Sequence, residues 1–151
     1  VHKKYQVIVK GIWKEKQKIV DLDLLKTNAD NGQKKVRVVK SFLKEPRAKA
    51  SRTVFFLKKN FSEYSLLDVK LITGRTHQIR TQLSHLGFPI LGDDKYGDFI
   101  LNKSLKKIGL KQMLLHSAEL GFTHPKNLKN ILIKAPIPIH ISDFIAQNEK
   151  K

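Results

Sequence analysis

The sequence contains no cysteine and few acidic residues. The missing thiols exclude disulfide bonds, thiolate metal ligands and a cysteine nucleophile, and they fit a cytoplasmic protein. No apolar run approaches the length that spans a membrane, so the sequence predicts no membrane partner. Only 13 aspartates and glutamates oppose 30 lysines and arginines, which gives a formal net charge of +17. This excess favours a polyanionic partner, above all nucleic acid, because a surface that is merely soluble requires much less charge.

The remaining composition is that of a globular protein. Hydrophobic residues make up 40% of the 151 residues, which is enough for the core of one domain. Short β-branched or alternating stretches predict strands over residues 5–9, 19–25, 36–39, 53–57, 64–72, 114–123 and 128–133. Because most of these stretches follow one another through short connections, an antiparallel or mixed sheet is favoured over a doubly wound one.

The hydrophobic period changes after the fifth predicted strand. Three apolar residues recur at the helical spacing i, i+4, i+7, namely Ile79, Leu83 and Leu86. They predict a helix over residues 75–86, with His77 and Arg80 on its polar side. Two shorter helices are predicted over residues 101–110 and 143–148.

A dense group of polar residues surrounds the start of the first predicted helix. The guanidinium of Arg80 can hold a carboxylate or a phosphate through two parallel hydrogen bonds, although an isolated arginine is usually just solvated. Gly74, His77 and Gln78 lie within about one turn of it, which favours a site. His77 can serve as a base, a phosphate contact or a buried hydrogen-bonding residue, and the last role is the commonest.

Other candidate residues have simpler explanations. Tyr5, at the start of the first predicted strand, can stack on a base, but packing is its default role. The three aspartates around Tyr96, which are Asp93, Asp94 and Asp98, indicate a solvated or capped loop more than a divalent ion site. No pair of histidines has the spacing of a helical zinc site, so the sequence predicts no metal.

Four ordered motifs carry a resemblance to a known family. They are Lys4-Tyr-Gln-Val-Ile-Val-Lys-Gly11, Thr73-Gly-Arg-Thr-His-Gln-Ile-Arg80, Gly87-Phe-Pro-Ile-Leu-Gly-Asp-Asp-Lys-Tyr-Gly97 and Leu115-His-Ser-Ala-Glu-Leu-Gly-Phe-Thr-His-Pro125. In this order they resemble the RluA family of ribosomal large subunit pseudouridine synthases, and its RluC type in particular. The resemblance covers almost the whole chain.

The resemblance implies a fold, an activity and site residues. The fold is α+β, with a mixed, mostly antiparallel sheet flanked by helices. The activity is isomerisation of specific uridines of 23S ribosomal RNA to pseudouridine, without a metal or a small-molecule cofactor; no oligomeric state is specified. Arg80, which pairs with a catalytic aspartate, and Tyr5, which stacks under the target base, are the catalytic positions. The substrate-binding positions are Leu120, as an apolar wall of the uracil pocket, with His77, Gln78 and Arg75.

One motif of the family does not occur among these residues. The nucleophilic aspartate of the RluA family stands in an HRLDxxTSG motif upstream of the tyrosine motif, and no aspartate here has that context, whether Asp21, Asp23, Asp68 or Asp93. We therefore expect residues 1–151 to be a partial catalytic domain, without the upstream aspartate segment and any RNA-binding S4 domain. Such a fragment should bind RNA weakly and be inactive alone, with Arg80 facing water or an anion.

Two other functions fit the composition. A non-catalytic basic RNA-binding module would use the same groups only to grip phosphate, and would bind RNA without isomerising it. A metal-independent ribonuclease would use His77 and His116 with a lysine, and would cleave the chain instead; no spacing in the sequence favours it.

Overall fold

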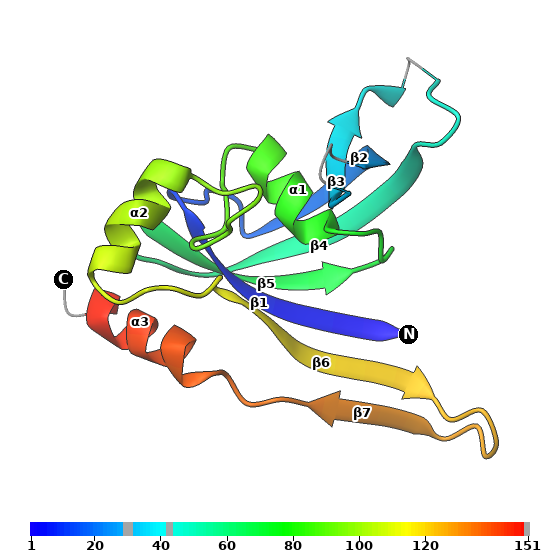
Figure 1. Cartoon of the computed structure of the whole chain (residues 1–151). Coiled ribbons are helices and arrows are strands. Elements are labelled where there is room, and N and C mark those ends of the chain that lie inside the picture. Colours follow the sequence, from blue (N-terminus) through cyan, green and yellow to red (C-terminus); the bar gives the residue numbers. More distant parts are fainter. Residues whose placement is uncertain (29–31, 42–43, 150–151) are drawn as a thin grey trace.

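A seven-stranded sheet forms the body of the protein (Figure 1). The computed structural model describes residues 1–28, 32–41 and 44–149. The strand order is β3-β2-β4-β5-β1-β6-β7, and every pairing between these described strands is antiparallel. The strands are β1 (His2–Lys10), β2 (Gln17–Asn28), β3 (Lys34–Val39), β4 (Lys49–Asn60), β5 (Tyr64–Leu71), β6 (Leu115–Thr123) and β7 (Asn130–Lys134).

Three helices border the sheet in the described part of the chain. They are α1 (Gln78–His85), α2 (Phe99–Lys107) and α3 (Ile139–Glu149). Figure 1 shows α1 over the middle of the sheet, with α2 and α3 at one end of it. The expected α+β class, with a mostly antiparallel sheet flanked by helices, is confirmed.

Two of the predicted helix starts are corrected. Helix α1 begins at Gln78, not at residue 75, because His77 has the left-handed φ of 52° and cannot continue a helix. Helix α3 begins at Ile139, before the predicted start at residue 143. It follows Pro138, whose carbonyl accepts hydrogen bonds from the backbone N–H groups of Ile141 and Ser142.

Strand β1 contributes residues to both hydrophobic clusters of the core. Val7 and Val9 belong to the cluster that holds Ile79 and Leu83 of α1. Ile8 belongs to a second cluster, which includes residues of α2 and α3. Successive strand residues point to opposite faces, so β1 separates the two clusters. Tyr5 packs against the α1 cluster, which places its ring on the same face of the sheet as α1.

Candidate functional site

An ion pair between Arg80 and Asp93 lies at the centre of the polar group. The Nε of Arg80 donates to Oδ2 of Asp93 at 2.9 Å, and its Nη2 donates to Oδ1 at 2.7 Å. The side chain of Asp93 is 1% exposed and that of Arg80 is 16% exposed. The expectation that Arg80 faces water or an anion is therefore wrong. A buried aspartate from the loop after α1 holds it in a bidentate pair.

Asp93 is held in turn by its own loop. Its Oδ1 accepts hydrogen bonds from the backbone N–H groups of Lys95 and Tyr96, and Asn102 of α2 donates to its carbonyl oxygen. Burial raises the pKa of Asp93, but the hydrogen bonds from Arg80 and from these two backbone groups outweigh it, so the pKa lies below its ordinary value. The carboxylate therefore stays ionised at neutral pH. The prediction of a capped loop is confirmed.

Tyr96 connects Arg80 to the edge of the sheet. Its hydroxyl lies 2.8 Å from Nδ1 of His77 and accepts a hydrogen bond of 2.9 Å from the backbone N–H of Val36 in β3. The guanidinium of Arg80 lies over its ring, 5.2 Å from the centroid. Neither Asp93 nor Tyr96 was predicted as a site residue. Both stand in the motif at residues 87–97, which is the signal that could have identified them.

His77 supplies the turn that enters α1. Its left-handed backbone, usually found at glycine or asparagine, is held by the contact with Tyr96. Burial lowers the pKa of His77, and the positive charges of Arg80 and Lys95 lower it further. The imidazole is therefore neutral at physiological pH, and it is half-buried as the first residue before the helix.

Gln78 lies in the interior. The residue is 2% exposed, and its side chain makes four hydrogen bonds inside the protein. The oxygen accepts from the hydroxyl of Thr73 and the backbone N–H of Arg75, and the amide nitrogen donates to the carbonyl of Arg52 and the hydroxyl of Thr53. The structure thus places Gln78 under the turn, and its role as a substrate-binding residue stays a prediction. Arg75 itself is exposed beside β4 and donates to the carbonyl of Ala50.

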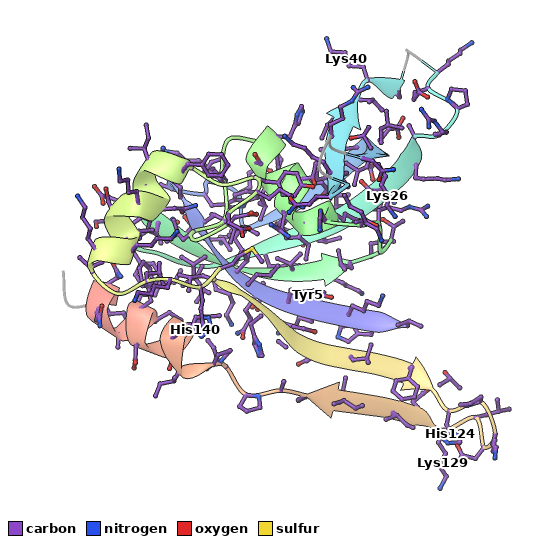
Figure 2. The ribbon with its side chains drawn as sticks, viewed as in Figure 1. Tyr5, Lys26, Lys40, His124, Lys129 and His140 are labelled. Carbon is purple, nitrogen blue, oxygen red and sulfur yellow. The ribbon has the colours of Figure 1, made fainter. Side chains whose placement is uncertain are left out.

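Tyr5 and Leu120 lie on the neighbouring strands β1 and β6. Figure 2 labels Tyr5 on β1. Leu120 of β6 is 37% exposed and lies opposite Lys3, two residues before Tyr5 in the same strand. Facing partners of an antiparallel pair share a face, as do residues two apart in a strand. The register of β1 and β6 shifts between Lys4 and Tyr5, and the extra residue, Ala118, lies in β6, so the alternation of β1 is kept. The fold therefore brings Tyr5 and Leu120 to the face of the sheet that α1 and Arg80 occupy.

His77 and His116 are not brought together by the sheet. His116 of β6 pairs with Gln6, whose side chain points to the face opposite Tyr5, and its Nε2 lies 3.1 Å from the carbonyl oxygen of Ala135. Among the residues that the structure describes, no group of three histidines, aspartates or glutamates could hold a metal ion. In the same residues, no helix is long and apolar enough to cross a membrane.

Comparison with known proteins identifies the family of the chain. Residues 1–85 match the RNA pseudouridylate synthase family. The ribosomal large subunit pseudouridine synthase C of Buchnera aphidicola subsp. Baizongia pistaciae is 40% identical over 138 residues, which are 91% of this chain and 42% of that protein. The protein of the same name from Haemophilus ducreyi is 33% identical over 97% of this chain and 44% of its own length.

Solved structures show the same fold. The human RNA pseudouridylate synthase domain containing 1 protein superimposes with a TM-score of 0.72 at 20% identity, over 99% of this chain and 66% of that one. The domain containing 4 protein gives 0.73 at 23% identity, over 98% of this chain and 62% of that one. The chain belongs to the RNA pseudouridylate synthase family, and it is similar to the synthases C of the ribosomal large subunit. It spans less than half the length of those curated relatives.

Proposed function

We propose that these residues form part of an enzyme that isomerises uridines of 23S ribosomal RNA to pseudouridine, in the cytoplasm and without a cofactor. The similarity to synthases C extends over 91% and 97% of the chain in the two relatives described above. The observation that carries the proposal is the ordered guanidinium of Arg80, held on the same sheet face as Tyr5 and Leu120. The nucleophilic aspartate belongs to a segment outside these residues.

Arg80 retains the donors that such an aspartate needs. A guanidinium has five N–H groups, and Asp93 takes one from Nε and one from Nη2. The remaining donors, both N–H groups of Nη1 among them, can donate to a second carboxylate. Pairing with Arg80 would keep that aspartate ionised, and it would fix its position relative to the sugar of the target uridine. Asp93 orients the guanidinium for this contact.

Tyr5 and Leu120 would hold the uracil ring. The target uridine leaves its stack and enters the site, where an aromatic ring and an apolar side chain can bind its two faces. The aspartate either bonds to C1′ or takes a proton from C2′ as the bond between C1′ and N1 breaks. The uracil then turns and C5 bonds to C1′, which breaks the bond between C1′ and the aspartate in the first route and returns the proton to C2′ in the second. The hydrogen of C5 is released to water, and N1 gains a proton. His77 and Gln78 keep the turn before α1 in place, and Arg75 contacts the RNA.

Release of the C5 hydrogen gives a direct test. A transcript of large-subunit ribosomal RNA that carries 5-tritiated uridine is incubated with this chain and with a protein extended upstream through an HRLDxxTSG motif. We expect tritium release from the extended protein alone. Release from neither would favour the non-catalytic RNA-binding module. Release from both would place the nucleophile within these 151 residues and overturn the proposed role of the upstream segment.

The role of Arg80 is tested in the extended protein with Arg80→Lys. A lysine cannot make the bidentate pair, so we expect tritium release to fall roughly 100-fold, as for a misplaced catalytic group. Arg52→Lys is the matched control. Arg52 also makes a bidentate pair with an aspartate, Asp21, but both side chains are more than half exposed. Equal losses in the two variants would contradict a specific role for Arg80.

A further inference from the structure

A basic groove lies between the outer ends of β2 and β3, the start of β4 and the turn before α1. Its volume is about 660 Å³. Five cationic side chains line it, Lys26, Lys34, Arg47, Lys49 and Arg75, and all five residues are exposed. None of its described lining residues is an aspartate or a glutamate. Figure 2 labels Lys26 on β2, next to β3.

The groove is the outward continuation of the core face of the sheet. Along this face of β2, Val20 and Leu24 are buried and the next residue of the same parity, Lys26, is exposed. Lys49 of β4 lies opposite Leu24, and Val36 of β3 lies opposite Lys26. The face that packs against α1 therefore changes from apolar to cationic where the helix no longer covers it. An ordinary solvated face would mix both signs of charge.

Three contacts connect the groove to the candidate active site. The Nζ of Lys95 donates to the carbonyl of Lys34 at 2.8 Å, and the backbone N–H of Val36 donates to Tyr96. On the other side, Nζ of Lys3 lies within 3.3 Å of the position of a Cβ on Gly74, which lines the groove. Lys3 is two residues from Tyr5. The groove thus borders both the loop that holds Arg80 and the strand that carries Tyr5.

Cationic side chains outnumber acidic ones where the groove meets the candidate active site. Burial is the largest cause of the lowered pKa of His77, and the charges of Arg80, Lys95 and Lys34 lower it further, against the charge of Asp93, which raises it. Among the described residues, none of the five cations lining the groove forms an ion pair. A concave surface of one sign concentrates counter-charge, and the backbone of RNA supplies one negative phosphate per nucleotide.

We propose that this groove binds the phosphodiester backbone of the RNA strand next to the target uridine. The position of that uridine rests on the proposed function, whereas the binding of phosphates rests on the groove itself. The groove holds the strand by charge and shape and reads no bases, so it serves any RNA that the active site accepts. Its contacts to Lys95 and Tyr96 place the bound strand beside Arg80.

The test compares two triple variants of equal net charge. The groove variant is Lys26→Ala, Lys34→Ala and Lys49→Ala. The control variant is Lys107→Ala, Lys126→Ala and Lys129→Ala, which removes three exposed lysines from α2 and from the turn between β6 and β7. Binding of a short fluorescein-labelled single-stranded RNA is measured by anisotropy over a series of salt concentrations, and circular dichroism checks the fold of each variant.

We expect the groove variant alone to lose affinity and salt dependence. Each phosphate contact on a single strand contributes about 0.7 to the slope of log K against log salt concentration, so the loss of three contacts lowers the slope by about 2. An unchanged slope in the groove variant, or equal changes in both variants, would overturn the proposal, because binding would then reflect the overall charge.

A second measurement requires no variant. Acetylation of lysines in the unmodified protein, with and without the same RNA, reports which amines the RNA covers. We expect protection of Lys26, Lys34 and Lys49 and none of Lys107, Lys126 and Lys129. Equal protection of all six lysines would overturn the proposal that RNA binds in the groove. In the extended protein the tritium assay separates the two proposals. Protection of the groove lysines without isomerisation would support RNA binding in the groove and contradict the proposed enzymatic activity. Isomerisation without protection of these lysines would support the activity and contradict RNA binding in the groove.

Discussion

Asp93 holds Arg80 in one orientation before any RNA binds. Its carboxylate accepts from two guanidinium nitrogens and from two backbone N–H groups, so each of its oxygens has a partner. The sequence identified Arg80 through the motif at residues 73–80, and it also displayed Asp93 within the next motif. It could not predict that the two side chains form an ion pair. They are 13 residues apart, and the intervening turn at Gly87 brings them together through a path that no helical or strand period describes.

Asp93→Asn should therefore destabilise the protein. The substitution leaves the guanidinium of Arg80 buried without its counter-charge, which costs about 3 kcal/mol of unfolding free energy. Urea unfolding monitored by circular dichroism measures it. Asp94→Asn is the control, because Asp94 is 93% exposed and only 3.5 Å from Arg80 at its nearest, so we expect a change of less than about 0.5 kcal/mol. Similar losses in the two variants would contradict the structural importance of the Asp93 pair.

The sequence predicted the strands from short β-branched or alternating stretches. The strand predicted over residues 5–9 is part of β1 (His2–Lys10), and the alternating stretch at 19–25 is part of β2 (Gln17–Asn28). The ends were less predictable, because they depend on long-range contacts. Strand β1 is longer than predicted because β5 and β6 supply hydrogen-bonding partners on both sides. Likewise, the strand order with β1 between β5 and β6 has no local signal.

The loop between α1 and α2 contains a second feature that the sequence did not reveal. Gly92, directly before Asp93, has a φ of 81°, and a Cβ on it would lie 2.5 Å from the backbone oxygen of Gln112. The glycine thus allows two segments to approach closely beside the Arg80 pair. The same loop also turns at Gly87, which has a similar φ of 87°, but there a Cβ would meet nothing within 4 Å.

These two glycines form a matched pair for substitution. Gly87→Ala should cost about 1 kcal/mol, which is the usual strain of a left-handed alanine. Gly92→Ala bears the same strain and a backbone clash, so we expect it to cost a further 1–3 kcal/mol or so. Chemical denaturation of both variants measures the two losses of unfolding free energy. If Gly92→Ala is no more costly than Gly87→Ala, the close approach to Gln112 is not a constraint on the loop.

At the scale of the whole molecule, the charge imbalance has two opposite consequences. The 13 carboxylates cannot pair one to one with all 30 lysines and arginines, so the folded chain carries net repulsion among its cations. The repulsion opposes folding, because folding brings the cations closer together. The same excess attracts RNA. The composition predicted this property directly, whereas the concentration of cations in one groove required the register of β2, β3 and β4.

Salt should therefore act on stability and on RNA binding in opposite directions. Added sodium chloride shortens the range of the repulsion, to about 10 Å at 0.1 M, and should raise the thermal midpoint by about 4 °C for each kcal/mol of repulsion relieved. Over the same range the affinity for single-stranded RNA should fall steadily. Thermal melting and anisotropy on one salt series measure both effects.

The triple variant at Lys107, Lys126 and Lys129 carries three fewer positive charges, so its thermal midpoint should rise less steeply with salt. Its RNA binding should keep the salt dependence of the unmodified protein. A midpoint that falls with salt would mean that attractive ion pairs, such as Arg80 with Asp93, outweigh the repulsion of the excess cations.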